Sequence, residues 1–89
     1  MKIKVYTIPN CPFCLKLKGL LDDDSIKYET IDVSLDENEK EFEDLSKLSG
    51  SESIPMVTIG VNLLAPDVNF STIEQAKELI QYILENETE

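Results

Sequence analysis

The chain contains two cysteines, Cys11 and Cys14, and they stand two residues apart in the sequence CPFC. Such a pair is used as a structural disulfide, as half of a metal site, as two packed apolar side chains, or as a dithiol for redox chemistry. The sequence contains no histidine and no arginine. A cysteine thiolate is therefore the one nucleophile that the composition predicts.

The redox dithiol is the interpretation of this pair that the sequence favours. A zinc site would need a second pair of ligands, and the chain offers no histidine or further cysteine to supply it. A structural disulfide would close a very short loop, and its entropic stabilisation shrinks with the loop. Two packed cysteines have no reason to occupy the start of a helix. A C-x-x-C motif that begins the helix of a β-α-β unit is typical of redox proteins.

The periodicity of the apolar residues predicts seven elements in the order β-α-β-α-β-β-α. The sequence predicts strands over 2–8 and 26–33, helices over 12–24 and 34–50, two short strands within 55–66, and a last helix that begins near residue 71. Residues 85–89 are expected to form a frayed acidic tail. The chain is thus predicted to be one domain, residues 1–89.

Capping boxes are predicted for the second and third helices. Ser34 and Glu37, and again Ser71 and Glu74, have the spacing at which two side chains cap a helix start reciprocally. A three-residue spacing of apolar side chains predicts the inner face of the second helix. Its members are Phe42, Leu45 and Leu48.

This order of elements constrains the topology. The first β-α-β unit should form a right-handed crossover, which makes its two strands parallel. The short connection between the third and fourth strands predicts an antiparallel hairpin. The expected fold is α/β, with a four-stranded mixed sheet that carries helices on both faces.

The expected position of the dithiol explains how it would be activated. Pro12 suits the first helical position, so Cys11 becomes the N-cap, where free N–H groups and the helix dipole stabilise a thiolate. A lowered pKa would make Cys11 the attacking sulfur, and Cys14, one turn further on, the resolving one. Lys18 lies two turns along, about 10 Å away, and would only support this effect.

The charge distribution argues against several classes of partner. Residues 1–21 hold four lysines and no acid, whereas residues 22–89 hold all 18 acidic residues, and the net charge is −10. Phosphate backbones would be repelled, so no nucleic acid partner is expected. No apolar stretch is long enough to span a membrane, and the start of the chain lacks signal-peptide character. We expect a cytoplasmic monomer.

CPFC after VYT, with Lys18 four places beyond the second cysteine, resembles the dithiol glutaredoxins of the thioredoxin-like superfamily, whose usual motif is C-P-Y-C. The resemblance extends over essentially the whole chain. It implies a thioredoxin-like fold and an enzyme that exchanges thiols and disulfides, with glutathione as reducing co-substrate and no bound cofactor or metal. The implied clients are disulfide-containing or glutathionylated proteins, and ribonucleotide reductase is a customary partner of such proteins.

The same resemblance assigns a glutathione site. Ile54 and Pro55 stand where the family carries T-V-P with a cis proline, which implies a cis Ile54–Pro55 bond that faces Cys11. The backbone of Ile54 would then pair with the cysteinyl part of glutathione. Phe13 replaces the usual tyrosine and keeps its ring.

Two departures from the family concern this site. Ile8 stands where the family often has a lysine or arginine, and residues 65–75 replace a G-G-x-D-D-like segment. Ser71 and Thr72 could still offer hydroxyls and helix N-terminal amides to the γ-glutamyl carboxylate, or Ser71 could be a plain helix cap. The departures favour a second hypothesis, a redoxin reduced by thioredoxin reductase. A third is a non-catalytic module that holds an iron–sulfur cluster or a partner, against which Pro12 argues.

Overall fold

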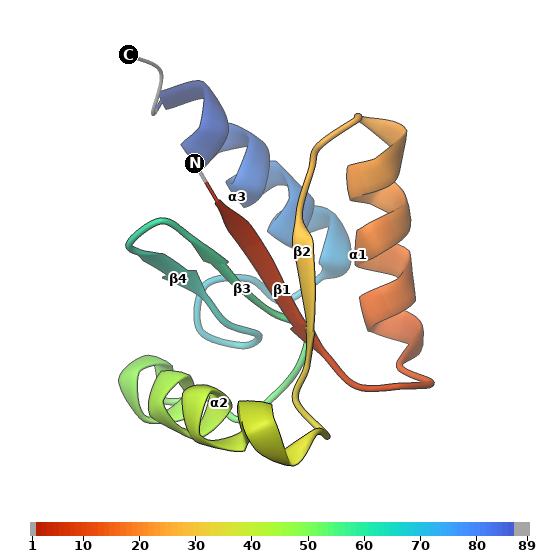
Figure 1. Ribbon diagram of the computed structural model, residues 1–89. Coiled ribbons are helices and arrows are strands. Elements are labelled where there is room, and N and C mark those ends of the chain that lie inside the picture. The colour runs from red at the N-terminus through yellow and green to blue at the C-terminus, as the bar shows by residue number, and fades with distance from the viewer. Residues whose placement is uncertain (1, 87–89) are drawn as a thin grey trace.

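The computed structural model describes residues 2–86, and its elements follow the predicted order (Figure 1). The strands are β1 (Ile3–Thr7), β2 (Glu29–Asp32), β3 (Met56–Ile59) and β4 (Asn62–Leu64), and the helices are α1 (Pro12–Asp23), α2 (Asp36–Ser49) and α3 (Ile73–Asn86). The predicted α/β order is confirmed.

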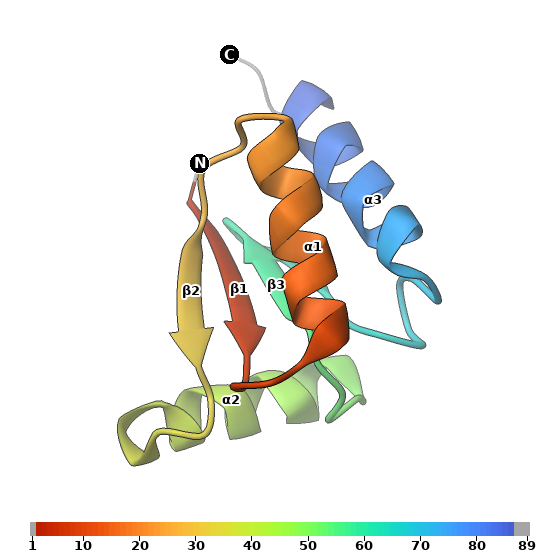
Figure 2. The same cartoon turned by 90° about the vertical axis from the view of Figure 1, so that its right-hand side faces the viewer.

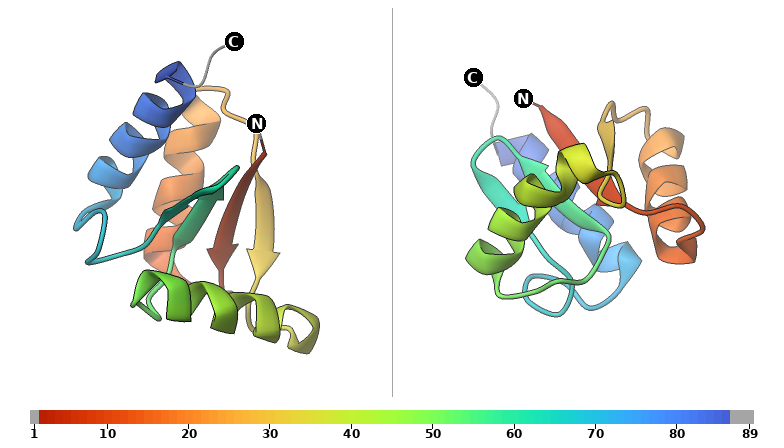
Figure 3. Two further views of the ribbon diagram at one scale, coloured as in Figure 1. Left: turned by 90° about the vertical axis from the view of Figure 1, so that its left-hand side faces the viewer. Right: turned by 60° about the horizontal axis from the view of Figure 1, so that its bottom comes forward.

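The four strands form one mixed sheet in the order β2-β1-β3-β4. β1 runs parallel to β2, with Val5 opposite Thr30, and antiparallel to β3, with Val5 opposite Val57. β3 and β4 form the predicted antiparallel hairpin. Helices α1 and α3 lie on one face of the sheet and α2 lies on the other (Figure 2 and Figure 3), so the predicted layers are confirmed as well.

The alternation of β1 divides its side chains between two cores. Ile3 and Val5 belong to the larger core, between the sheet and helices α1 and α3, and Tyr6 belongs to the smaller core beneath α2. The larger core consists of Ile3, Val5, Leu17, Leu21, Val57, Ile59, Leu64, Phe70, Ile73, Ala76 and Ile80. Because β1 is buried on both faces, the loop that follows it is anchored to a strand packed between the two cores.

The smaller core corrects one expectation for α2. Phe42 and Leu45 pack against this core, but Leu48 is 78% exposed. Each residue turns an α-helix by about 100°, so the sixth residue after Phe42 points about 120° away from it. The three-residue spacing therefore predicted one buried position too many.

Strand β2 is shorter than the predicted 26–33. It forms an edge of the sheet and pairs only with β1 over four residues. Ile26 and Tyr28 precede it and still pack against the larger core. The apolar residues at positions 26 and 28 alternate because they pack against the larger core, and this part of the chain does not pair with β1.

The capping box predicted at Ser34 is absent. Helix α2 begins at Asp36, and its N-cap, Leu35, makes no side-chain capping bond. The hydroxyl of Ser34 instead donates to Asp32 Oδ1 at 2.6 Å, and the Ser34 N–H donates to the same oxygen at 2.9 Å. These bonds hold the pKa of Asp32 below its usual range.

The cap of α3 lies one residue later than predicted. Thr72 Oγ1 accepts the N–H of Gln75 at 3.1 Å. In return Gln75 Oε1 accepts the N–H groups of Ser71 at 2.7 Å and of Thr72 at 3.2 Å. The box is therefore Thr72 with Gln75, and Ser71 and Glu74 do not form it.

The last helix also extends further than expected. Glu85 and Asn86 belong to α3, so the predicted frayed tail is wrong for these two residues, and the rest of it lies outside the described residues. The start of β1 and the end of α3 lie near each other, at the end of the sheet opposite the loop between β1 and α1 (Figure 1). Across residues 2–86, no helix combines the length and apolar character needed to cross a membrane.

Candidate active site

The CPFC motif lies at the junction between β1 and α1. Asn10 turns the chain with a φ of 64°, in the left-handed region that asparagine tolerates well. Pro12 occupies the first turn of α1, and Cys11 is its N-cap. Cys11 Sγ accepts the N–H of Cys14 at 3.2 Å. The predicted N-cap position of Cys11 is thus confirmed, and a free helix N–H points at its sulfur.

The two cysteines are joined by a disulfide, with their Cα atoms 5.2 Å apart. Cys11 is 8% exposed and Cys14 is 1% exposed. Cys11 is therefore the more accessible residue of the two, and Cys14 is almost completely buried. This asymmetry is what an attacking and a resolving cysteine require.

A cavity of about 440 Å³ is lined by Phe13, the residue between Pro12 and Cys14, while neither cysteine is among the described residues of its wall. Its walls come from the start of α1, the segment before β3 and the start of α3. They bring together the side chains that the resemblance assigned to glutathione: Phe13, Ile54, Pro55, Ser71 and Thr72. Residues more than 50 positions apart in the sequence thus share one surface.

The Ile54–Pro55 peptide bond is cis, as predicted. Pro55 is buried, whereas Ile54 is half-buried and lines the cavity. The cavity wall therefore includes the segment whose backbone was expected to pair with the cysteinyl part of glutathione.

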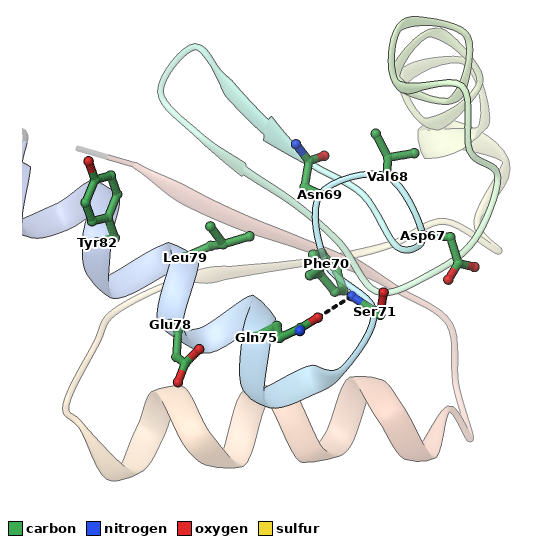
Figure 4. A pocket seen from close by; sticks show the side chains of 9 residues that line it. All are labelled: Asp67, Val68, Asn69, Phe70, Ser71, Gln75, Glu78, Leu79 and Tyr82. Atoms are coloured by element: carbon green, nitrogen blue, oxygen red, sulfur yellow. Dashed lines mark hydrogen bonds between the residues drawn. The ribbon is translucent and has the colours of Figure 1, made fainter.

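The backbone amides at the start of α3 already have a partner inside the protein. Both the Ser71 and the Thr72 N–H groups donate to Gln75 Oε1, and Figure 4 shows the bond to Ser71. A ligand carboxylate that used these amides would have to displace the Gln75 side chain. Spacing alone gave no sign of this internal contact.

Among the described residues that line the cavity, the cation is Lys16, which spacing alone does not distinguish from Lys18. Lys16 Nζ lies 2.6 Å from Glu74 Oε2, and both residues line the cavity. The hydrogen bond from Lys16 lowers the pKa of Glu74. Lys18, which was expected to support the dithiol, is half-buried and is not among the described residues that line this cavity.

A second cavity, of about 640 Å³, adjoins the first and shares Asp67, Phe70 and Ser71 with it (Figure 4). The loop between the two cavities replaces the glycines of the family. Ala65 and Asn69 close it reciprocally, because the Ala65 N–H donates to Asn69 Oδ1 at 3.0 Å and the Asn69 N–H donates to the Ala65 oxygen at 3.0 Å. Asp67 adopts a φ of 63°. An asparagine side chain therefore holds this turn.

Exposed apolar side chains flank the two cysteines in the sequence. Ile8 is 41% exposed, and Phe13 and Leu15 are each 63% exposed. Exposed apolar side chains that cluster around a reactive group often mark a binding surface. Within residues 2–86, histidine, cysteine, aspartate and glutamate form no group of three or more that could hold a metal ion.

Comparisons with known proteins agree with this architecture. The Glutaredoxin family model matches residues 3–64. Glutaredoxin 1 of Rickettsia conorii is 39% identical over 57 residues, which cover 64% of this chain and 56% of the relative. Human Glutaredoxin-1 is 28% identical over 83 residues, which cover 89% of this chain and 78% of the relative. The chain thus matches little more than half the length of the rickettsial relative.

Solved structures show the same fold. The thioredoxin-like protein BC3987 is 33% identical, with a TM-score of 0.66, and the match covers 88% of this chain and 99% of that protein. A buckwheat glutaredoxin–glutathione complex has a TM-score of 0.70 at 20% identity, over 90% of this chain and 68% of that protein, and this likeness concerns the fold alone. The α/β fold is thioredoxin-like, and with a family model that spans most of its length the chain belongs to the glutaredoxin family.

Proposed function

We propose that this protein is a glutathione-dependent thiol–disulfide oxidoreductase that reduces protein disulfides and glutathione mixed disulfides through Cys11 and Cys14. The observation that carries the proposal is the position of Cys11. Cys11 is the more exposed residue of the pair, it caps α1, and its sulfur accepts a helix N–H. Such an environment lowers a thiol pKa and favours the thiolate.

The mechanism begins with the reduced protein. With a glutathionylated client, the Cys11 thiolate attacks the glutathione sulfur, the client thiolate leaves and takes up a proton, and a mixed disulfide forms between Cys11 and glutathione. A second glutathione thiolate then attacks the glutathione sulfur of this mixed disulfide. Glutathione disulfide leaves, and the Cys11 thiolate is restored.

Reduction of a protein disulfide needs both cysteines. The Cys11 thiolate attacks one client sulfur and the other client sulfur leaves as a thiolate. The Cys14 thiolate then attacks the Cys11 sulfur, which releases the second client thiol and leaves the Cys11–Cys14 disulfide. That disulfide is the form present in the structure. Two glutathione molecules reduce it and leave together as glutathione disulfide.

The cavity that Phe13 lines supports glutathione as the small co-substrate. In this proposal the Phe13 ring covers the tripeptide, the Ile54 backbone pairs with its cysteinyl part, and the start of α3 takes a carboxylate. The exposed apolar side chains of Ile8 and Leu15 would contact the client protein. Ribonucleotide reductase, a customary partner of glutaredoxins, is one candidate client of a monomeric enzyme.

Replacing Cys14 separates the two reactions. Cys14→Ser should retain removal of glutathione from a glutathionylated peptide, because Cys11 alone carries that reaction. The same variant should lose reduction of a peptide disulfide, because the mixed disulfide cannot be resolved. Cys11→Ser is the matched control and should lose both activities. Loss of both activities in Cys14→Ser would contradict the proposed roles.

A second candidate differs only in the electron donor. Ile8 stands where glutaredoxins often carry a cation, and Gln75 already occupies the two amides at the start of α3. Both observations favour a redoxin that accepts electrons from thioredoxin reductase. Turnover of the same peptide disulfide should be measured with glutathione plus glutathione reductase and, separately, with thioredoxin reductase. Turnover with only the second system would overturn the glutathione proposal.

A further inference from the structure

We propose that Lys16 binds a carboxylate of glutathione and that Glu74 competes with this carboxylate for the same ammonium group. This inference rests on the proposed function and names a specificity determinant within the same site. Glu74 then acts as an internal stand-in for the ligand carboxylate, and binding exchanges one carboxylate partner of Lys16 for another.

The charges that line the cavity support this assignment. Among residues 2–86, Lys16 is the one cation in its wall, and Asp67 and Glu74 are the acids. Lys16 Nζ and Glu74 Oε2 are 2.6 Å apart. An anionic ligand in this cavity therefore meets a single ammonium group, and a protein carboxylate already holds it.

The ion pair is weak enough to be exchanged. The side chain of Lys16 is 52% exposed and that of Glu74 is 60% exposed. Exposed ion pairs contribute little net stability, because water and salt screen both partners. Glu74 lies in the first turn of α3, where the helix dipole favours a carboxylate even without Lys16. Release of Glu74 therefore costs little.

Lys16 also accounts for the missing cation at Ile8. Glutaredoxins often carry a lysine or arginine at that position, and here an exposed isoleucine occupies it. Lys16 reaches the cavity from the second turn of α1 instead. The positive charge is thus supplied from the helix and not from the loop that precedes the dithiol.

The backbone amides of Ser71 and Thr72, in the wall of the same cavity, are also bonded to a side chain of the protein. Gln75 Oε1 accepts the N–H groups of Ser71 and Thr72 in the way that a carboxylate oxygen would. Glu74 and Gln75 are adjacent, so one short segment of α3 forms both the ion pair with Lys16 and the hydrogen bonds with the two amides. A carboxylate that enters must replace both side chains, which makes this segment a determinant of affinity.

The test measures kcat and KM of the full chain for a glutathionylated peptide at low ionic strength with saturating glutathione. Lys16→Gln should raise KM about threefold to tenfold, because a charge-assisted hydrogen bond is lost. Glu74→Gln should lower KM about twofold to fivefold, because the competitor loses its charge. In both variants kcat should stay close to that of the wild type. In the Lys16→Gln background, Glu74→Gln should bring no gain.

Two controls separate this effect from general changes in charge. Lys47→Gln and Glu43→Gln alter the same charges in an exposed ion pair of 3.7 Å on α2, and they should leave KM unchanged. The same peptide in a mixed disulfide with 2-mercaptoethanol carries no glutathione carboxylate. Its KM should not respond to Lys16→Gln.

The outcomes distinguish failure of the inference from failure of the proposed function. If the wild type is active and Lys16→Gln leaves KM unchanged, the inference alone is overturned. An equal rise of KM for the 2-mercaptoethanol substrate would also overturn it, as would a gain from Glu74→Gln that persists without Lys16. A wild type that does not turn over the glutathionylated peptide would overturn the proposed function and this inference with it.

Discussion

The reactivity that we propose for Cys11 depends on its immediate backbone. Its sulfur accepts the Cys14 N–H at 3.2 Å, and Pro12 follows it in the first turn of the helix. The helix dipole and the free N–H groups act on Cys11 far more strongly than on Cys14, which lies inside the helix and is nearly inaccessible. The two sulfurs of one motif should therefore ionise differently.

This difference can be measured in the reduced protein. In Cys14→Ser, the rate of Cys11 alkylation by iodoacetamide should follow a pKa clearly below the usual thiol value of about 8.5. The same variant unfolded in denaturant is the control and should return the usual value. A folded pKa at or above that of the unfolded chain would contradict thiolate stabilisation by the helix terminus.

Tyr6 provides a second prediction for a single side chain. It is 2% exposed, its hydroxyl donates to Glu41, and desolvation is the main cause that raises its pKa. A raised folded pKa means that the folded state holds the phenol proton more tightly than the unfolded state. The stability from this group is therefore complete below the unfolded value of about 10 and is lost as the pH rises above it.

Denaturant titrations of the wild type and Tyr6→Phe should reveal this loss. At pH 7 the variant should lose about 1 kcal/mol of unfolding free energy, because the partly buried hydrogen bond from Tyr6 to Glu41 is missing. Between about pH 9 and 11 the wild type should lose stability more steeply than the variant. Parallel curves across this range would contradict the assignment.

Two glycines, one at the end of α2 and one within α1, allow the same substitution to be compared in two backbone conformations. Gly50 ends α2 with a φ of 80°, and Gly19 lies within α1. A Cβ at either position would meet no atom within 4 Å, so only backbone conformation distinguishes them. Gly50→Ala should destabilise the protein by about 1–2 kcal/mol, and Gly19→Ala should stabilise it by about 0.5–1 kcal/mol.

Thermal or denaturant unfolding of the two variants checks this pair directly. The opposite signs matter more than the magnitudes, because the two substitutions add the same atoms. If both variants shift the free energy of unfolding in the same direction, conformational strain at Gly50 is not the controlling factor.

The sequence predicts the helices and strands well, because their formation depends mainly on residues close to one another in the chain. The helix over 12–24, the Cys11 cap and the hairpin within 55–66 follow from neighbours a few residues apart, and the structure contains all three. The errors arise where a side chain has two possible hydrogen-bond partners, or where its partner lies far away in the sequence. The Ser34 hydroxyl could bond forward to α2 or back to Asp32, and it bonds back.

The candidate site shows the same limit. Cys11 could be selected from its motif alone, whereas the pair of Lys16 and Glu74 joins α1 to α3 across 58 positions of sequence. No periodicity links two such residues before the fold brings them together. Lys18 follows the cysteines at a regular helical spacing, but that spacing does not decide which lysine reaches the cavity.

At the scale of the whole molecule, the fold redistributes the charge of the sequence. Three of the four lysines in residues 1–21 form ion pairs with acids that come later in the chain. These pairs are Lys2–Glu29, Lys4–Glu41 and Lys16–Glu74. The basic N-terminal segment is thereby largely neutralised, and the net charge of −10 dominates the field that a client meets.

The charge of the client should therefore control its rate of encounter. For a peptide disulfide with net positive charge, kcat/KM should fall about threefold to tenfold as salt rises from about 10 mM to 200 mM. For a peptide that differs only in carrying acidic residues in place of the basic ones, kcat/KM should rise over the same range of salt. A neutral peptide is the control. Equal salt dependence of the cationic and anionic peptides would contradict long-range electrostatic control.

The arrangement of the chain has one practical consequence. The start of β1 and the end of α3 lie at the end of the sheet opposite the loop that holds the dithiol (Figure 1). A fluorescent protein joined through a flexible linker to either of these ends would be held away from the reacting sulfurs. We therefore expect a genetic fusion at these ends to leave the dithiol accessible.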